Sequence, residues 1–334
     1  MAELLEINDL TVELSVRGGH RLVLDRVSLD LAPGEALGLV GESGSGKSTM
    51  ARAVVRGLPD GARVRGNLRF KGADISAMSP KQLRAFRSQS VATIGQNPRA
   101  SMNPVRRIGD YATEALRTNF KVPLAEALRR AAVVLGDIGI NAPERVLRQY
   151  PHQLSGGMLQ RVVIAAALLV EPDLIIADEP TTALDVTTQS EVMAILQSMQ
   201  AERGMAMLFI THDLDLAAAV CDRTAVLYAG QIIEDQASSQ LQSHPQHPYT
   251  SGLVSARPRV DVGIERLVTI PGRPLAAYER GAGCTFAPRC EYATDICREN
   301  MPPVLVTTSG RVACWHAEEL GTLLHNHEGE SIGS

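Results

Sequence analysis

The chain is poor in lysine and in aromatic residues and carries no excess of positive charge. Lysine occurs at positions 47, 71, 81 and 121 only, so arginine supplies most of the positive charge. Aromatic residues make up 4% of the 334 residues, with a single tryptophan, which argues against a stacking surface for single-stranded nucleic acid. The net charge is −4 at pH 7, whereas proteins dedicated to duplex DNA present a basic field. We therefore expect no nucleic-acid partner.

Long apolar runs are also lacking. The longest uninterrupted run covers residues 162–170, far fewer than the roughly 20 residues that cross a bilayer. The first residues, Met-Ala-Glu-Leu-Leu-Glu, contain neither a basic region nor a long apolar stretch, so we expect no export signal. These features predict a protein of the cytosol, and they leave docking on a membrane open.

The length and the apolar content predict an ordinary folded protein. At roughly 150 residues per domain, 334 residues suggest about two domains, and 45% hydrophobic residues supply ample core. Near-alternating segments at 4–16 and 21–31, with a further strand at 67–70, indicate an antiparallel sheet. Short apolar runs at 36–40, 174–177, 207–210 and 224–228 indicate buried parallel strands. Helical stretches at 47–57, at 157–170 and through most of 80–150 separate them, which is typical of an α/β fold.

Residues 41–48 read Gly-Glu-Ser-Gly-Ser-Gly-Lys-Ser and match G-x-x-x-x-G-K-[ST] at every fixed position. The motif lies between a predicted strand and a predicted helix, which is the context that a phosphate-binding loop requires. Its glycines let the backbone N–H groups converge on phosphate oxygens, and the helix N-terminus adds a favourable dipole. Lys47 is expected to contact the β- and γ-phosphates and Ser48 to reach Mg²⁺. The predicted phosphate-binding residues are Gly41, Ser43, Gly44, Ser45, Gly46, Lys47, Ser48 and Thr49.

Two acids follow the apolar run 174–177. We expect Asp178 to hold Mg²⁺, directly or through water, because a carboxylate at the edge of an apolar sheet needs a cation. Glu179 is expected to polarise the attacking water. Taken alone, the pair is equally compatible with an ordinary strand end, and the phosphate motif favours the functional interpretation.

Several further segments follow in order. They are Leu-Ser-Gly-Gly-Met-Leu-Gln-Arg at 154–161, Gln96 within Ile-Gly-Gln-Asn-Pro, Ala183-Leu184-Asp185, and His212 within Ile-Thr-His-Asp. Together with the phosphate motif they resemble the signature motif, Q-loop, D-loop and switch histidine of ATP-binding-cassette (ABC) ATPases. The resemblance covers about residues 4 to 316.

The resemblance implies a fold and a set of roles. The fold is an α/β P-loop ABC ATPase, with a RecA-like core, an antiparallel β subdomain and an α-helical subdomain, plus a small irregular C-terminal cysteine-rich extension. The nucleotide-binding domain is expected at 1–235, with the helical subdomain at about 96–160, and the extension at 236–334. Two cassettes pack head to tail in this family, and each ATP lies between one phosphate loop and the partner's signature motif. ATP and Mg²⁺ are the implied ligands.

Individual roles follow from the same resemblance. Glu179, His212, Lys47 and Gln96 are the implied catalytic residues, and Gln96 joins Ser48 and Asp178 around Mg²⁺. Ser155, Gly156 and Gly157 are expected to face the nucleotide of the partner cassette, and Asp185 of the D-loop is an implied nucleotide-binding residue. Three departures from the family pattern concern Met158 in the signature, the lack of an aromatic residue at 16–20 for adenine stacking, and Gly95 and Asn97 beside the Q-loop glutamine.

The tail narrows the resemblance to one branch. His-Pro-Tyr-Thr-Ser-Gly-Leu at 247–253 and Ile-Pro-Gly-Arg-Pro at 270–274 resemble the extension of oligopeptide and dipeptide importer ATPases. Four cysteines, Cys284, Cys290, Cys297 and Cys314, resemble the iron–sulfur element of that branch. Four thiolates can hold a [4Fe–4S] cluster or Zn²⁺, and metal-free structural thiols are a third possibility; the resemblance favours the cluster. We interpret Cys221 as an ordinary packed thiol.

The implied function is the ATP-hydrolysing subunit of a bacterial importer for di- and oligopeptides, peripheral on the cytoplasmic face of the inner membrane. The implied partners are a second, homologous ATPase in a heterodimer, two transmembrane permease subunits and a periplasmic substrate-binding protein. One alternative keeps the machinery and changes the cargo to nickel, an opine, glutathione or an antimicrobial peptide. The others are a soluble ABC ATPase acting on DNA or ribosomes and a non-enzymatic interaction module built on the cysteine tail.

Overall fold

The computed structural model describes residues 3–182, 184–256 and 269–326. The chain divides into two compact units, each assembled from separate stretches. Within the described ranges, the first unit contains the residues of Leu31–Glu35 and Ile75–Phe209, and the second contains those of Ala2–Asp30, Ala36–Asp74 and Ile210–Ser334. Among the helices of the described ranges, none combines the length and the apolar character needed to cross a bilayer.

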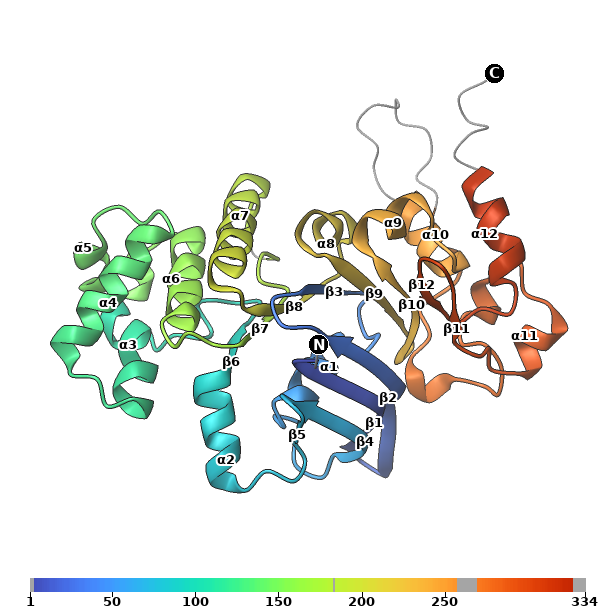
Figure 1. The fold of residues 1–334 in the computed structure, drawn as a ribbon, viewed down its shortest axis with the longest axis horizontal. Coiled ribbons are helices and arrows are strands. Elements are labelled where there is room, and N and C mark those ends of the chain that lie inside the picture. Colours follow the sequence, from blue (N-terminus) through green and yellow to red (C-terminus); the bar gives the residue numbers. More distant parts are fainter. Residues whose placement is uncertain (1–2, 183, 257–268, 327–334) are drawn as a thin grey trace, which may run out of the picture. The chain divides into compact units, whose positions relative to one another are not determined.

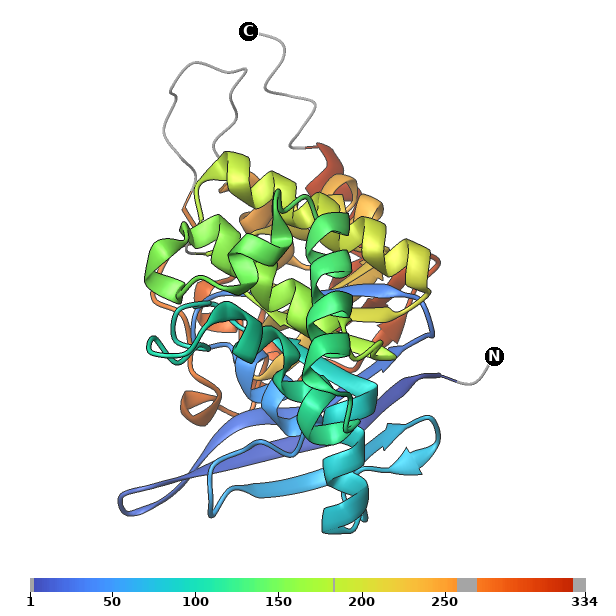
Figure 2. The same cartoon turned by 90° about the vertical axis from the view of Figure 1, so that its left-hand side faces the viewer.

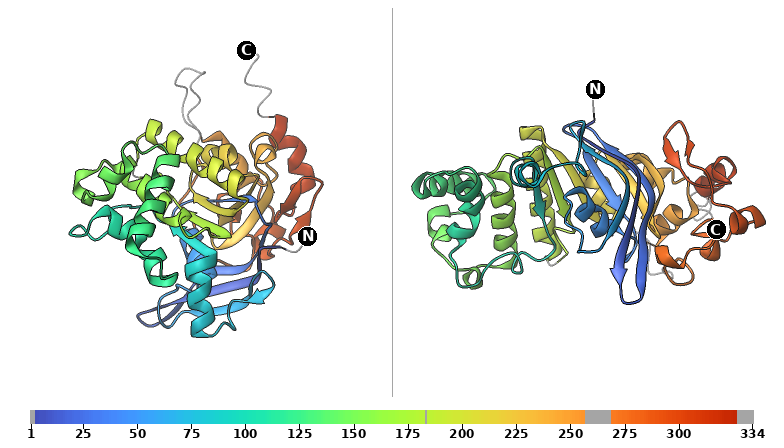
Figure 3. Two further views of the ribbon diagram at one scale, coloured as in Figure 1. Left: turned by 60° about the vertical axis from the view of Figure 1, so that its left-hand side comes forward. Right: turned by 90° about the horizontal axis from the view of Figure 1, so that it is seen from below.

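An antiparallel sheet forms one part of the second unit. Its strand order is β2-β1-β4-β5, with the bounds β1 (Leu5–Val16), β2 (Gly19–Leu31), β4 (Arg63–Phe70) and β5 (Ala73–Asp74). Strand β1 pairs with β4 in a register that places Leu5 opposite Phe70. The long β1–β2 hairpin (Figure 3) turns at Gly18, whose φ of 91° lies in the left-handed region that glycine tolerates best.

The second unit also contains five strands in the order β11-β12-β10-β9-β3. Strand β3 pairs with β9 in parallel, and the β9–β10, β10–β12 and β11–β12 pairs are antiparallel. Their bounds are β3 (Ala36–Val40), β9 (Arg223–Tyr228), β10 (Gln231–Ala237), β11 (Leu305–Val306) and β12 (Gly310–Val312). The helices of this unit are α1 (Lys47–Val54), α8 (Leu214–Val220), α9 (Ser238–Ser243), α10 (Pro248–Ser255), α11 (Asp295–Glu299) and α12 (Ala317–Asn326).

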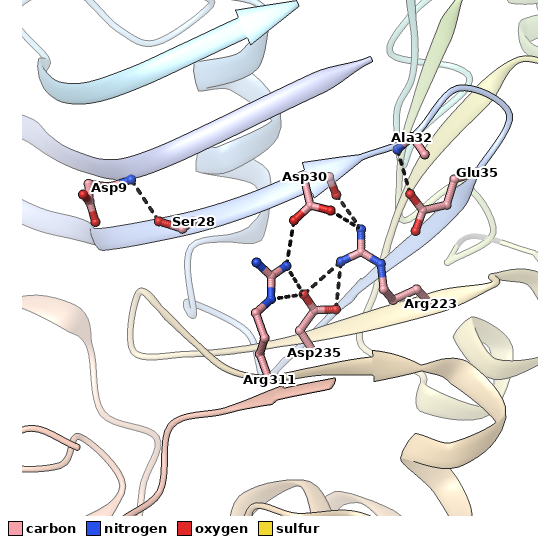
Figure 4. Close-up of polar contacts among 8 residues, drawn as sticks. All are labelled: Asp9, Ser28, Asp30, Ala32, Glu35, Arg223, Asp235 and Arg311. Atoms are coloured by element: carbon pink, nitrogen blue, oxygen red, sulfur yellow. Dashed lines mark hydrogen bonds and ion pairs between the residues drawn. The ribbon is translucent and has the colours of Figure 1, made fainter. Parts of the chain in front are cut away.

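A network of charged side chains links β12 to β9 and β10 of this sheet (Figure 4). Asp235 on β10 is 2% exposed and accepts hydrogen bonds from Arg223 on β9 and from Arg311 on β12. Both guanidinium groups also bond to Asp30 on β2. Two arginines therefore share two carboxylates, so the buried charge of Asp235 is compensated.

Three of the chain's few aromatic residues meet in the core of the second unit. Tyr228 ends β9, Tyr249 lies on α10, and Phe286 lies in the C-terminal region. The ring centroids of Tyr228 and Tyr249 are 4.7 Å apart, and each lies 5.4 Å from that of Phe286. Tyr228 and Tyr249 are tilted relative to each other, and both meet Phe286 edge-on. These contacts join the C-terminal region to the sheet through one apolar cluster.

The first unit combines a short sheet with a group of helices. Strand β6 (Val91–Ile94) pairs in parallel with β7 (Leu174–Asp178). Strand β8 (Ala206–Thr211), whose residues up to Phe209 belong to this unit, lies on the other side of β7. The helices are α2 (Pro80–Ala85), α3 (Ile108–Asn119), α4 (Leu124–Asp137), α5 (Pro143–Leu147), α6 (Gly156–Leu168) and α7 (Val186–Arg203). Helices α3 to α6 pack together (Figures 1 and 2). On α3 the buried residues Ile108, Ala112 and Leu116 recur every four positions, which is the period of a helix face turned to a core.

The predicted α/β class is confirmed, with two local differences. Strand β6 lies inside the segment expected to be mostly helical. The C-terminal region was expected to be irregular, and it contains short helices together with β11 and β12.

Candidate nucleotide site

The phosphate motif forms the loop between β3 and α1 in the second unit. All five residues of β3 are buried, and α1 begins at Lys47. Gly44 and Gly46 have φ values of 82° and 113°, which a residue with a Cβ reaches only under strain. A Cβ on Gly46 would also lie 2.7 Å from Leu24 Cδ2. Gly46 is therefore required by both conformation and space, and Gly44 by conformation alone.

This loop presents the groups that an anion needs. The N-cap of α1 is Gly46, so no side chain caps the helix N-terminus, where the helix dipole favours negative charge. Lys47 is buried, and its Nζ donates to the carbonyl oxygens of Gly41 at 2.7 Å and Glu42 at 3.0 Å. The buried Ser45 Oγ has no hydrogen-bond partner among the described residues. This donor set fits phosphate oxygens.

The predicted acids lie at the end of β7 in the first unit. Asp178 is the last residue of the strand, and Glu179 follows it with a φ of 47°. Left-handed backbone is uncommon for a residue other than glycine. Thr182 Oγ1 donates to Glu179 Oε2 at 3.0 Å. The Glu179 carboxylate is therefore oriented by a residue that the sequence did not single out.

Gln96 lies at the same edge of this sheet as the acids. Ile94, the last residue of β6, pairs with Ala177 of β7, and the carboxyl ends of parallel strands meet at one edge. Gln96 follows β6 by two residues and is exposed. The first unit thus brings Gln96, Asp178 and Glu179 to one sheet edge.

Residues of the signature and the D-loop meet through Thr188. Ser155 caps α6 by accepting a hydrogen bond from Met158 N at 3.3 Å, and Asp185 caps α7 by accepting from Thr188 N at 3.0 Å. A Cβ on Gly157 would lie 2.4 Å from Thr188 Cγ2. Hydrogen bonds from Thr188 hold the pKa of Asp185 below its usual range. Ala183, predicted to open the D-loop, lies outside the described residues.

His212 belongs to the second unit and is exposed between β8 and α8. The next residue, Asp213, caps α8 by accepting hydrogen bonds from Asp215 N and Leu216 N. Asp213 N in turn donates to Thr211 Oγ1 at 3.0 Å. These bonds fix the backbone on both sides of His212.

The iron–sulfur prediction is wrong. Cys284, Cys290, Cys297 and Cys314 line one cavity of about 20 Å³, which is the space of a single water. Within the part of the chain that the structure describes, no group of three or more His, Cys, Asp or Glu residues is arranged to hold a metal ion. This finding contradicts the predicted [4Fe–4S] cluster. It provides no set of ligands for Zn²⁺ either.

Three of these four cysteines have raised pKa values. Burial raises the pKa of Cys284, that of Cys290 to about 11 and that of Cys314 to about 12. The neutral thiol is therefore the favoured form of Cys290 and Cys314 at physiological pH, whereas metal ligands must be thiolates. Cys284 and Cys290 pack against the aromatic cluster of the second unit, and Cys314 packs in a smaller apolar cluster with Val312. Cys221 is buried, as predicted for a packed thiol.

Two family profiles match the chain. The profile described as ABC transporter matches residues 24–182. The profile described as oligopeptide/dipeptide transporter, C-terminal region, matches residues 233–297.

Curated relatives match most of the chain. A putative peptide import ATP-binding protein of Brucella abortus is 42% identical over 314 residues, which cover 93% of this chain and 94% of that protein. The oligopeptide transport ATP-binding protein OppD of Salmonella typhimurium is 39% identical over 317 residues, which cover 95% and 94%. OppD of Mycobacterium tuberculosis is 41% identical over 321 residues. The chain spans only about half of the mycobacterial protein, 52% of its length.

Solved structures share the fold of the chain. A dimeric ATP-binding cassette bound to ADP and Pi in a post-hydrolysis state superposes with a TM-score of 0.63 at 26% identity, covering 70% of this chain and 98% of that one. The cbiO1 protein of Clostridium perfringens, part of an ABC transporter complex, gives a TM-score of 0.62 at 27% identity, covering 72% and 91%.

Proposed function

The chain belongs to the family of ABC transporter ATP-binding proteins, and from this premise we propose that it is the ATP-hydrolysing subunit of a bacterial importer for di- and oligopeptides. One observation carries the proposal. A glycine-built phosphate loop and the C-terminal region of oligopeptide and dipeptide transporters occur in a single chain. The Brucella and Salmonella relatives, which are named for peptide transport, align with nearly the whole of it.

The phosphate loop binds the triphosphate of ATP in this proposal. Lys47 supplies a positive charge, and the N-terminus of α1 supplies backbone N–H groups and the helix dipole. The binding residues are Gly41, Ser43, Gly44, Ser45, Gly46, Lys47, Ser48 and Thr49. Ser48, Asp178 and Gln96 provide the oxygen ligands that suit Mg²⁺, which neutralises phosphate charge when bound.

Glu179 acts as the general base on water, and His212 orients the reacting groups. The bond from Thr182 keeps the Glu179 carboxylate in one orientation, and a positioned acceptor is what proton abstraction requires. The capped turn from Thr211 to Asp213 similarly fixes the backbone of His212.

A second cassette completes each site in the proposed assembly. Ser155, Gly156 and Gly157 open α6 and form an anion-binding N-terminus with Asp185 beside it through Thr188. We propose that these residues face the ATP bound by a homologous, distinct partner ATPase. Binding of two ATP molecules closes the pair, hydrolysis reopens it, and two permease subunits receive the motion. A periplasmic binding protein delivers the peptide, and the chain lies on the cytoplasmic face of the inner membrane.

Reconstitution with the partner ATPase, the permeases and a peptide-loaded binding protein tests the proposal. The Glu179→Gln variant is expected to retain ATP and to lose hydrolysis. Glu171→Gln is a matched control, because Glu171 is an exposed glutamate with a similar left-handed φ of 49°; it is expected to hydrolyse ATP at the wild-type rate. Persisting hydrolysis in Glu179→Gln would contradict the assignment of the base.

The same preparation tests the cargo. Stimulation of hydrolysis by peptides supports a peptide importer. Stimulation by nickel, an opine, glutathione or an antimicrobial peptide instead would assign another cargo to the same machinery. Hydrolysis without any response to the permeases would favour a soluble ABC ATPase.

A further inference from the structure

Glu42, the second residue of the phosphate loop, is held through three of its groups. Its N–H donates to Tyr249 Oη at 3.1 Å, and its carbonyl oxygen accepts from Lys47 Nζ at 3.0 Å. Its carboxylate accepts two hydrogen bonds from Arg289, at 2.8 and 3.2 Å. Tyr249 and Arg289 both lie within the part of the chain that matches the transporter C-terminal region. That region therefore contacts the loop directly.

The side chain of Arg289 is buried and is held in place by hydrogen bonds and by aromatic contacts. Its side chain is 5% exposed, Nε donates to Pro271 O at 2.8 Å, and Nη1 lies 3.4 Å from Tyr228 Oη. The guanidinium carbon lies 5.8 Å from the ring centroid of Tyr228 and 5.9 Å from that of Phe286. Because these contacts already immobilise the planar guanidinium group, Arg289 loses little further side-chain entropy when it forms a bidentate pair with Glu42.

The pair has an electrostatic consequence for the loop. A carboxylate one residue after Gly41 places negative charge beside a site built for phosphate, and like charges in a partly dehydrated site repel. Arg289 neutralises that carboxylate. The hydroxyl of Tyr249 and the ammonium of Lys47 meanwhile fix the peptide groups on both sides of Glu42. Charge compensation and backbone placement thus act on the same residue.

We propose that Arg289 is a positioning residue of the nucleotide site, through which the C-terminal region sets the affinity of the phosphate loop for ATP. The inference rests on the proposed function, since it concerns the same site. Arg289 acts through Glu42, so it alters ATP binding more than the rate of the chemical step.

The test measures ATP dissociation constants for the full chain by titration with a fluorescent ATP analogue. Arg289→Met leaves Glu42 unpaired, and we expect its dissociation constant to rise by about tenfold, the scale set by losing one charge-assisted pair. Glu42→Gln removes the repelling charge, so the double variant Glu42→Gln/Arg289→Met should regain most of the loss. In the reconstituted transporter, KM for ATP should rise while kcat stays within about twofold.

Arg273→Met is the matched control. Arg273 forms a bidentate pair with Glu279 in the same region, with both hydrogen bonds at 2.9 Å, and its side chain is 73% exposed. We expect wild-type ATP affinity for this variant. A loss equal to that of Arg289→Met would attribute the effect to general damage of the region and would overturn the proposal.

Further outcomes separate the two hypotheses. A folded Arg289→Met variant with wild-type affinity overturns the positioning role. If Arg289→Met does not fold, Arg289→Gln, which also removes the positive charge but keeps a polar side chain, gives the same comparison, and unchanged affinity in it overturns the role. A wild-type chain that binds no ATP contradicts the proposed function itself, whatever Arg289 does.

Discussion

Arg311 on β12 donates to the buried carboxylate of Asp235 on β10, with Nε 3.1 Å from Oδ2 (Figure 4). Asp235 also receives both bonds of Arg223 Nη1, at 2.9 and 3.0 Å. A short strand of three residues has few backbone bonds of its own. The side-chain pair therefore contributes a large share of what holds β12 in the sheet.

Replacement of Arg311 by leucine should destabilise the second unit. Arg223 still compensates part of the charge on Asp235, so we expect a loss of about 1.5–3 kcal/mol in the free energy of unfolding, the range for hydrogen bonds to charged groups. Urea denaturation measures it. Arg298→Leu is the control, because the Arg298–Asp295 pair is exposed on both sides, at 60% and 94%, and should change stability by less than about 0.5 kcal/mol. Equal effects of the two variants would contradict the role given to Arg311.

Gly157→Ala should disturb the contact between the signature helix and the D-loop. The new methyl group would lie 2.4 Å from Thr188 Cγ2, while Thr188 Oγ1 is engaged with Asp185 Oδ2 at 2.8 Å. We expect a loss of about 1–3 kcal/mol, as for overpacking. Thr188→Ser removes the clashing methyl and keeps the hydroxyl, so Gly157→Ala/Thr188→Ser should recover most of the stability. Failure of that rescue in thermal unfolding would locate the damage elsewhere.

Gly44 and Gly46 should respond differently to alanine. Both have left-handed φ values, but a Cβ on Gly44 meets nothing within 4 Å, whereas a Cβ on Gly46 meets Leu24 and the Val23 carbonyl. Gly44→Ala should cost about 1–2 kcal/mol of backbone strain, and Gly46→Ala clearly more. Parallel measurements of unfolding and ATP affinity check this order. A larger loss for Gly44→Ala would contradict it.

The sequence predicted those strands best whose buried residues are apolar. The run that became β3 is buried throughout, so its composition alone identified it. Strand β10 was not predicted, because Glu234, Asp235 and Gln236 are buried in it at 1–2% exposure. Polar residues are tolerated in the core only because residues distant in sequence form hydrogen bonds and ion pairs with them. The composition of the strand does not indicate which residues these partners are.

At the candidate site, too, local sequence patterns were predictive, whereas contacts between residues distant in sequence were not. Motif spacing was enough to nominate Lys47 and Glu179, since the phosphate motif and the strand-end acids are local patterns. Spacing gave the wrong answer for the cysteines, because it does not report that the four side chains line a cavity of only about 20 Å³. Arg289 was missed for a related reason: its contact with Glu42 spans 247 positions and follows no local pattern.

Because of His247, the free energy of unfolding should decrease at acidic pH. Burial lowers its pKa from 6.5 to about 3, and its Nδ1 caps α10 by accepting from Tyr249 N at 3.0 Å. The unfolded chain therefore binds a proton that the folded chain does not, so this contribution is complete above about pH 6.5 and is lost as the pH falls towards 3. His247→Asn keeps a capping oxygen without the titration. Its free energy of unfolding should fall less steeply between pH 6.5 and 4, by up to about 1.4 kcal/mol per pH unit.

Glu234 faces His247 and contributes with the opposite sign. Its Oε2 accepts from His247 N at 3.0 Å, and burial raises its pKa from 4.5 to about 7, against the hydrogen bonds that it accepts. Its contribution is therefore complete below about pH 4.5 and is lost as the pH rises through about 7. Comparing His247→Asn with its parent in a Glu234→Gln background removes this second titration. The difference in slope should keep its sign there, because it arises from the imidazole alone; a difference that disappears would assign the acid sensitivity to Glu234.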